Sequence, residues 1–329
     1  MKRFLIIQTA YIGDVILATP VCSELKRIYP DASIAMLVRK GNESLIANHP
    51  AIDEVFTLDK KLAKTRSIPK IVKQIRQTTY TEVINLQRFY SSGIICWLAK
   101  TEKRIGFENN ALSFIYDKKM THQFGDGTHE VARNLSLIAH HGAAKTVRPS
   151  IYPSHAAFQK IASLKIRPYV CLAPASVWFT KQLPVEKWVE LGKKLFSKNY
   201  IIYFLGGPSD WELCQNIISE ISNSDDELQN LCGKLTLLES AALMQGSVMN
   251  YVNDSGPLHL ASAVNAPVTA FFCSTTPQFG FGPLSDQAHT IETNEQLDCK
   301  PCGMHGHKAC PKGHFKCGKT IPISSIPLP

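Results

Sequence analysis

Long apolar runs are missing from this chain of 329 residues. None approaches the roughly 18–20 consecutive apolar residues that a membrane-spanning helix needs. The opening, MKRFLIIQTAYIGD, has only the apolar run FLII before Gln8 and Thr9, which indicates a buried strand and not a signal peptide. With 44% hydrophobic and 19% charged residues, the composition is that of a globular protein, which we expect in the cytoplasm.

The nucleotide-binding patterns GxGxxG and GxxxxGK(S/T) are also missing, which counts against a dinucleotide site or a P-loop. No RRM, KH or helix-turn-helix pattern occurs, and the basic stretch 60–76 has no interleaved aromatic residues, which counts against a nucleic-acid partner. The formal net charge of +9 still favours an anionic partner: nucleic acid, an acidic membrane face or a phosphorylated small molecule. Charge alone does not choose among them.

Short β-rich runs alternate with amphipathic segments along the N-terminal half. This alternation predicts a mostly parallel sheet with helices on both faces. The expected strands are Phe4–Gln8, Ser33–Val38, Glu82–Leu86 and Arg104–Phe107. The expected helices are Val15–Ile28 and a segment over 128–141 that ends at Gly142.

The alternation of strand-like and helix-like segments is absent between about 145 and 167, as in a domain connection, and then resumes. Strands are expected at Tyr169–Ala173, Tyr200–Leu205, Val248–Val252 and Val268–Phe272. Helices are expected at Val185–Phe196, Trp211–Ile221, Leu237–Gln245 and Gly256–Val264. The sequence therefore predicts two consecutive α/β domains, 1–160 and 161–329, with a cleft between them.

Ligands of open parallel sheets bind where strands end and helices begin. Four such junctions carry unusual residues: Gln8–Asp14, Ala173–Lys181, Leu205–Asp210 and Asn253–His259. In the last, a tight NDSGP turn leads into a helix whose unpaired N–H groups and dipole favour an anion. Asp254 or Ser255 also suits an ordinary N-cap. Gly256, with His259 one turn into the helix, makes anion binding the better hypothesis.

Each of the other junctions has a functional and a structural interpretation. Gly206 and Gly207 either form a turn or let a ligand approach the backbone. Lys181 is either an ordinary surface lysine or a cation that neutralises a pyrophosphate. Asp14 is either a helix cap or a carboxylate that takes a proton from a nucleophile.

Two clusters lie outside these junctions. Seven cations and no acid occur between Asp59 and Glu82, either as a solvated helix face or as a contact for an anionic partner. They are Lys60, Lys61, Lys64, Arg66, Lys70, Lys73 and Arg76. The last four of the ten cysteines have the spacing C-x2-C-x7-C-x6-C, which suits structural zinc, disulfides or an unliganded loop. They are Cys299, Cys302, Cys310 and Cys317.

Five segments occur in the order expected for one family. They are GDVILATP (13–20), TKQLPVEKW (180–188), LGGPSD (205–210), NDSGPLHLASAVNAPVTAFFCST (253–275) and CKPC…CPKGHFKC in the tail. Together they resemble the glycosyltransferase family 9 heptosyltransferases, which build the inner core of bacterial lipopolysaccharide. The resemblance implies a GT-B fold, two Rossmann-like domains with the nucleotide sugar bound mainly by the second. It implies inverting transfer of heptose from ADP-heptose to a core hydroxyl, with no catalytic metal or other cofactor.

The resemblance also implies roles for single residues. Asp14 matches the general base, Lys181 the lysine at the donor phosphates, and Asp210 an acid near the donor nucleotide. The donor motif around the diphosphate and the sugar is matched by Asp254, Ser255, Gly256 and His259. The acceptor side corresponds to the basic stretch that includes Lys60, Lys61, Lys64 and Arg66. The anionic acceptor places the enzyme peripherally on the cytoplasmic face of the inner membrane.

Alternatives to this interpretation stay open. A family member can use another nucleotide sugar for a different surface glycan, because few side chains choose the donor. An alternative from another functional class is a basic nucleic-acid-binding protein whose cysteine-rich tail binds zinc. The chain also departs from the family pattern: it ends at TIPISSIPLP with no expected helix after the last cysteine, and GMHGHKA lengthens the loop between Cys302 and Cys310.

Overall fold

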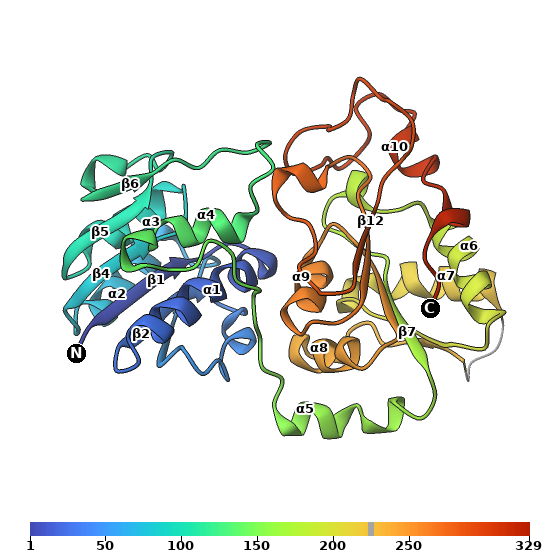
Figure 1. Cartoon of the computed structure of the whole chain (residues 1–329), viewed down its shortest axis with the longest axis horizontal. Coiled ribbons are helices and arrows are strands. Elements are labelled where there is room, and N and C mark those ends of the chain that lie inside the picture. The colour runs from blue at the N-terminus through green and yellow to red at the C-terminus, as the bar shows by residue number, and fades with distance from the viewer. Residues whose placement is uncertain (223–226) are drawn as a thin grey trace. The chain divides into compact units, whose positions relative to one another are not determined.

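The computed structural model describes residues 1–222 and 227–329. They form two compact units, Met1–Tyr152 and Pro153–Pro329, whereas the sequence analysis divided the chain after residue 160. Each unit contains one six-stranded sheet whose neighbouring strands all run parallel. Helices cover both faces of each sheet (Figure 1). Among the helices of the described residues, none is both long enough and apolar enough to cross a bilayer.

The sheet of the N-terminal unit has the strand order β3-β2-β1-β4-β5-β6. Its strands are β1 (Arg3–Gln8), β2 (Ser33–Arg39), β3 (Glu54–Leu58), β4 (Tyr80–Asn85), β5 (Thr101–Phe107) and β6 (Lys118–Met120). Its helices are α1 (Ile12–Ile28), α2 (Lys64–Ile75), α3 (Tyr90–Leu98) and α4 (Glu130–Ser136). The run FLII of β1 is fully buried, because the central strand of a covered parallel sheet has no solvent face.

The C-terminal unit repeats this topology in the order β12-β11-β10-β7-β8-β9. Its strands are β7 (Tyr169–Ala173), β8 (Ile201–Phe204), β9 (Leu228–Asn230), β10 (Met249–Asn253), β11 (Val268–Phe271) and β12 (Ala288–Ile291). Its helices are α5 (His155–Lys160), α6 (Val185–Phe196), α7 (Trp211–Ile221), α8 (Leu237–Gln245), α9 (Gly256–Ala263) and α10 (Lys316–Lys319). In both units the strand order reverses beside the first strand, so the topological switch points lie between β1 and β4 and between β7 and β10.

The chain after the last cysteine packs against the core of the C-terminal unit. Cys317 lies within the short helix α10, and a 3-10 turn follows at Ile323–Ser325. The side chain of Ile326 is buried in the core of the C-terminal unit, and the hydroxyl of Tyr251 donates a hydrogen bond of 2.9 Å to the Pro327 carbonyl. Among the described residues no α-helix begins after Cys317, as the sequence predicts, and this segment is held against the unit because its isoleucines pack in the core.

The helix expected over 128–141 is also shorter than predicted. The α-helix α4 ends at Ser136, and a separate 3-10 turn, Ala139–His141, follows it. Gly142 ends that turn with a φ of 82°, a left-handed conformation that favours glycine. The C-cap at Gly142 was predicted correctly, but it closes the turn and not the α-helix.

Candidate active site

The carboxyl ends of β7 and β10 meet at the switch point of the C-terminal sheet, where Ala173 pairs with Val252. Asn253, at the end of β10, is fully buried. Its Nδ2 donates a hydrogen bond of 2.7 Å to the Pro174 carbonyl, and its Oδ1 accepts one of 2.9 Å from the Leu183 backbone N–H. This side-chain amide therefore fixes the 174–183 loop against the end of β10.

The fixed loop brings Lys181 to Asp254. The Nζ of Lys181 lies 2.7 Å from Oδ2 of Asp254, and the Thr275 hydroxyl donates to the same oxygen at 2.7 Å. The side chains of Lys181 and Asp254 are 16% and 7% exposed. Asp254 is therefore one partner of a largely buried ion pair, and no sequence motif points to Thr275 as its third member.

The ion pair lies beside the first turn of α9. Ser255 occupies the N-cap position in an extended conformation but makes no side-chain capping bond to the helix; its hydroxyl instead approaches the Asn253 carbonyl at 3.4 Å. The backbone N–H groups of a first helical turn have no partner within their own helix, and the dipole is positive there. His259 lies in the next turn and is 6% exposed, with its ring edge-on to Phe281. A cation and a helix N-terminus thus share one corner, which suits a phosphate.

The loop between the second and third tail cysteines packs directly on Lys181. The His307 backbone accepts a hydrogen bond of 3.1 Å from the Thr180 N–H and donates one of 2.8 Å to the Thr180 hydroxyl. A Cβ built on Gly306, whose φ is 76°, lies 2.9 Å from Cγ of Lys181. The GMHGHKA segment therefore holds the Thr180–Lys181 backbone, a role that the sequence analysis did not foresee.

The junction at 205–210 is a capped turn. Asp210 accepts a hydrogen bond of 2.8 Å from the Gly207 backbone N–H, and a 3-10 turn covers Pro208–Asp210. A Cβ on Gly206 would lie 2.9 Å from both the Asp210 Cβ and the Cys232 sulfur. Gly206 thus has a structural role, whereas a Cβ on Gly207 would come no nearer than 3.6 Å to another side chain. The part of both glycines in donor binding, like that of Asp210, stays a prediction.

Asp14 lies in the first turn of α1, at the carboxyl end of β1. Its Oδ2 accepts a hydrogen bond of 3.1 Å from the Tyr11 backbone N–H, so the carboxylate caps the helix. The side chain remains partly exposed. A carboxylate that accepts one hydrogen bond still has lone pairs that can accept a proton, so the general-base assignment stays a prediction and is compatible with the geometry.

The sequence profile of the glycosyltransferase family 9 heptosyltransferases matches residues 68–311. The chain belongs to glycosyltransferase family 9. It is 28% identical, over 82% of its own length and 82% of the relative's, to lipopolysaccharide heptosyltransferase 3 of Escherichia coli. The structure of ADP-heptose lipopolysaccharide heptosyltransferase II of E. coli superposes with a TM-score of 0.78 at 20% identity, covering 92% of this chain and 96% of that one. The E. coli heptosyltransferase WaaC with ADP gives a TM-score of 0.72 at 19% identity, covering 88% and 92%.

Membership of glycosyltransferase family 9 makes this protein a sugar-transfer enzyme. The two parallel six-stranded sheets are those of the GT-B heptosyltransferases, so the fold class expected from the sequence is confirmed. The chemical class of the protein is therefore settled in favour of the transferase over the nucleic-acid-binding alternative.

The four cysteines of this family 9 chain gather in one region without forming a compact ligand set. Cys299, Cys302 and Cys310 are partly exposed and Cys317 is buried. The Cys299 sulfur lies 3.8 Å from Nε2 of His314. Burial raises the pKa of Cys317 to about 11, and the three other thiols add to this rise.

Four thiolates are a suitable donor set for structural zinc, whose tetrahedral geometry at 2.3 Å from each sulfur places the sulfurs about 3.8 Å apart. Within the described residues, no three of these sulfurs lie within 4.8 Å of one another. The sulfurs would have to move together around an ion, and zinc at this site stays a prediction.

The basic residues assigned to the acceptor lie at the carboxyl edge of the N-terminal sheet, the edge that also carries Asp14. Lys60 and Lys61 form an exposed turn after β3. Lys64 begins α2, and Arg66 is exposed in its first turn. The structure therefore brings these predicted residues to one edge of one unit.

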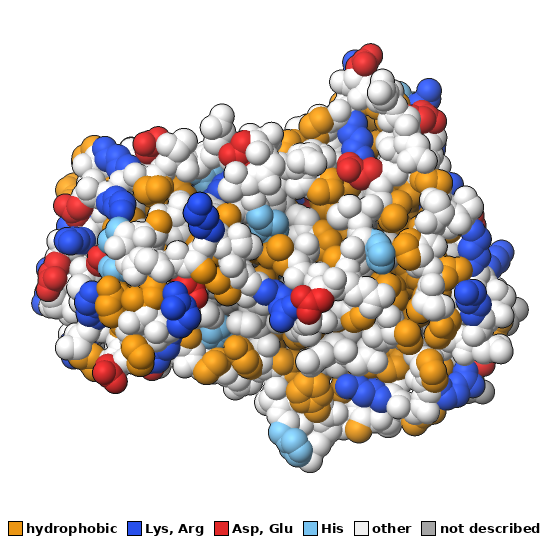
Figure 2. All heavy atoms as spheres, viewed as in Figure 1, with side chains coloured by type: hydrophobic (Ala, Val, Ile, Leu, Met, Phe, Trp, Pro, Cys, Tyr) orange, Lys and Arg blue, Asp and Glu red, His pale blue; other side chains and the backbone are white. Residues whose placement is uncertain are grey.

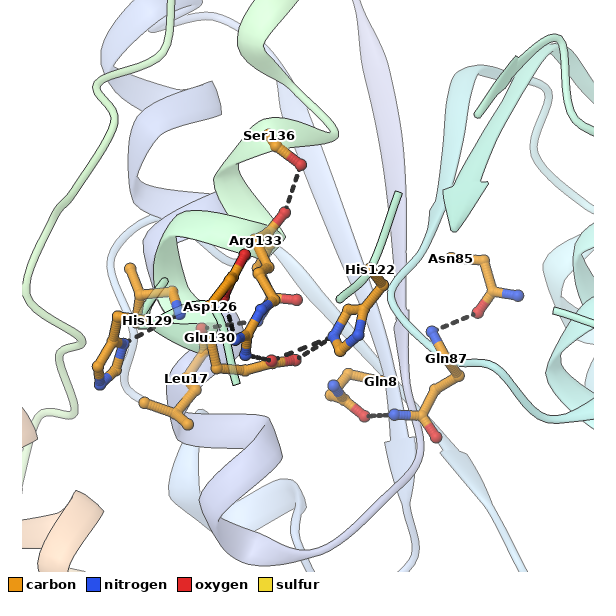
Figure 3. Close-up of polar contacts among 12 residues, drawn as sticks. Gln8, Leu17, Asn85, Gln87, His122, Asp126, His129, Glu130, Arg133 and Ser136 are labelled. Atoms are coloured by element: carbon orange, nitrogen blue, oxygen red, sulfur yellow. Dashed lines mark hydrogen bonds and ion pairs between the residues drawn. The ribbon is translucent and has the colours of Figure 1, made fainter. Parts of the chain in front are cut away.

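A buried polar cluster at this edge was missed by the sequence analysis. Figure 3 shows Glu130 between His122 and Arg133, with Nε2 of His122 3.1 Å from both carboxylate oxygens and the Arg133 guanidinium donating at 3.0 Å. Burial alone would raise the pKa of Glu130, but the hydrogen bonds from His122 and Arg133 hold it below its usual value. Beside this cluster the Gln87 amide donates to Gln8, at the end of β1 (Figure 3). Glu130 and Arg133 are an i,i+3 pair on α4, but His122 comes from the loop after β6 and Gln87 from the loop after β4, so no single sequence motif joins the four residues.

Proposed function

We propose that this enzyme transfers heptose from ADP-heptose to a hydroxyl group of the lipopolysaccharide inner core, with inversion at the anomeric carbon. The observation that carries the proposal is the Lys181–Asp254 pair beside the first turn of α9. The leaving group of such a transfer is a diphosphate, which is stabilised by a cation and by backbone N–H donors. The relatives named as lipopolysaccharide heptosyltransferases support the choice of donor and acceptor.

The proposed step is a single displacement. The acceptor hydroxyl oxygen attacks the anomeric carbon on the face opposite to the diphosphate and forms the new C–O bond. The bond from the anomeric carbon to the diphosphate oxygen breaks, and ADP leaves with the electron pair. Asp14 takes the hydroxyl proton. Lys181 and the first turn of α9 meet the charge that develops on ADP, so this chemistry requires no catalytic metal.

We also propose that the basic stretch meets the anionic acceptor at the cytoplasmic face of the inner membrane. Arg66, Lys70 and Lys73 are exposed on α2, while Ile71 and Ile75 of the same helix are buried. Beside them a hollow of about 450 Å³ has a mostly apolar lining. It is formed by residues of α2, by Arg76 and Gln77 after this helix, and by Leu98 of α3. On the face shown in Figure 2, basic and hydrophobic side chains of the N-terminal unit lie intermixed. Positive charge around apolar surface is complementary to an anionic lipid layer.

The nucleotide specificity tests the donor assignment. Calorimetric titration with ADP, UDP and GDP in EDTA is expected to show selective binding of ADP. A preference for UDP or GDP would contradict the ADP donor and favour the alternative, a family member that uses another nucleotide sugar. Incubation with ADP-heptose and a core acceptor, followed by mass measurement of the product, then tests whether heptose is the transferred sugar.

Vesicle sedimentation tests the membrane proposal. The wild type is expected to bind vesicles that contain phosphatidylglycerol and not vesicles of phosphatidylcholine alone. R66E/K70E should lose this binding, whereas K193E/K198E, the same change of charge at exposed lysines of the C-terminal unit, should keep it. Equal loss in both variants would mean that net charge, and not this helix, determines binding.

A further inference from the structure

A second cluster of ligand-type side chains lies in the N-terminal unit, away from the residues assigned to the reaction. Glu82 is the third residue of β4, where it pairs with Phe4 of β1, and its side chain is 4% exposed. His140 and His141 are the last two residues of the 3-10 turn that Gly142 ends. Helices of a parallel α/β unit return to the amino edge of the sheet, so this turn meets the beginning of β4 and not its carboxyl end.

Each of the two imidazoles contacts a different oxygen of the Glu82 carboxylate. Nε2 of His140 lies 3.3 Å from Oε1 of Glu82, and Nε2 of His141 lies 2.8 Å from Oε2. The ligand atoms of all three residues lie within 4.8 Å of one another. Among the residues that the structure describes, this is the one group of three His, Cys, Asp or Glu side chains that meets that distance.

The surroundings of the group hold His141 in a ligating orientation. Its Nδ1 lies 3.0 Å from the hydroxyl of Tyr29, and its ring is edge-on to the rings of Tyr29 and Phe4. A hydrogen bond at the second ring nitrogen is what fixes the tautomer and orientation of metal-binding histidines. His140 stays 25% exposed, which leaves one side of the group open to an incoming ion and to water.

We propose that Glu82, His140 and His141 form a binding site for a divalent transition-metal ion of the kind that imidazole ligands favour, such as Zn²⁺ or Co²⁺. Two imidazoles and one carboxylate supply three protein ligands, and water completes the coordination. The ion would join β4, the turn after α4 and, through Tyr29, the end of α1. Because these are the amino-edge ends of the elements, the ion is structural and independent of the proposed transfer.

Cobalt absorption distinguishes this group from the tail cysteines. The full chain, freed of metal with a chelator and then dialysed, is titrated with Co²⁺. Nitrogen and oxygen ligands give visible d–d bands alone, whereas thiolate ligands add an intense charge-transfer band in the near ultraviolet. We expect the addition of one equivalent of Co²⁺ to produce d–d bands. These bands should form whether or not the charge-transfer band appears.

Variants assign those bands to residues. H140A should weaken Co²⁺ binding in these bands at least tenfold, whereas H155A, at an exposed histidine of α5, should leave it unchanged. E82Q keeps the shape of the side chain and removes its charge, so it provides the same test if H140A fails to fold. Both variants should retain ADP binding, which separates this proposal from the function proposed above.

Three results would overturn the proposal: no Co²⁺ binding by the wild type, binding seen only with the thiolate band, or d–d bands that persist in both H140A and E82Q. Any of these would mean that the three side chains form a hydrogen-bonded group alone.

Discussion

Lys181 Nζ and Asp254 Oδ2 lie 2.7 Å apart. The two residues follow different strands, β7 and β10, and the strands β8, β9 and β10 lie between them in the sequence. Asp254 is in turn bound by Thr275, so the carboxylate already has two donors before any ligand arrives. The pair holds the Lys181 side chain in place in a largely buried corner. Two roles therefore coincide at Lys181: it neutralises Asp254, and in the proposed function it meets the donor diphosphate.

Substitutions of the pair separate these two roles. K181M should weaken ADP binding at least tenfold and also lower stability, because it leaves Asp254 buried without its cation. Removing one partner of a fully buried pair costs about 3–5 kcal/mol, and the cost is smaller here because the lysine is 16% exposed. K181M/D254N should recover most of the stability but not the ADP affinity. Calorimetry with ADP and urea unfolding measure the two quantities, and full recovery of affinity in the double variant would remove Lys181 from the donor site.

Asp14 can be tested without loss of its helix cap. The carbonyl oxygen of an asparagine at position 14 still accepts the Tyr11 N–H, but the amide cannot take a proton at neutral pH. D14N is therefore expected to lower kcat by about 10²–10⁴-fold with little change in unfolding free energy. D14A loses the cap as well and should cost about 0.3–1 kcal/mol of stability. Unchanged turnover in folded D14N would contradict the general-base assignment.

Gly306 offers a test of the loop that packs on Lys181. G306A places a Cβ 2.9 Å from Lys181 Cγ and should weaken ADP binding severalfold. Gly313 has nearly the same backbone conformation, φ 72° against 76°, but a Cβ there meets nothing within 4 Å. G313A is thus the matched control, since both alanines carry a similar cost of about 1–2 kcal/mol for the left-handed backbone conformation. An equal effect of the two variants on ADP affinity would argue against a positioning role for the loop.

Buried His49 should make stability sensitive to mild acid. Burial lowers its pKa to about 4, and its Nδ1 accepts the Ala51 backbone N–H at 3.2 Å, which a proton on that nitrogen would prevent. Below pH 6.5 the unfolded chain protonates this histidine while the folded chain does not, so unfolding free energy falls as the pH drops from about 6.5 to about 4. The loss is up to about 3 kcal/mol.

Urea unfolding at a series of pH values measures this loss. H49Q should flatten the curve across that interval, although it lowers stability at neutral pH. H155Q, at the exposed histidine of α5, should leave the slope unchanged. A wild-type stability that stays constant from pH 6.5 to pH 4.5 would contradict the assignment.

Helix α8 of the C-terminal unit was predictable because its ends carry local signals. Thr236 accepts the Glu239 N–H and Glu239 accepts the Thr236 N–H, a capping box that fixes the start of α8, and Gly246 follows its end. By contrast, β6 and β9 have three residues each, too few to establish a period of two. These edge strands form because a neighbouring strand offers them hydrogen bonds, and a local pattern does not record that neighbour.

The candidate site likewise has some features that the sequence predicted and others that it did not. Parallel topology predicted that Lys181 and Asp254 come to one edge, since both follow strands of one sheet. It did not predict Thr275 as the third partner or the contact of His307 with Thr180, which joins residues 127 apart in the chain. Such contacts depend on the path of a loop, and loop paths are set by packing that no short motif encodes.

The positions of β7 and β10 within their sheet have a consequence for dynamics. Both are central strands with a hydrogen-bonded neighbour on each side, whereas β9 and β12 are the edge strands of the sheet. The backbone amides of central strands exchange with solvent only in rare openings of the sheet, while those of edge strands exchange through local fraying. The amides of 170–172 and 250–252 should therefore be among the slowest to exchange deuterium. The scaffold beneath Lys181 and Asp254 would then persist while the edge strands open locally, so the proposed anion-binding corner would stay assembled between turnovers.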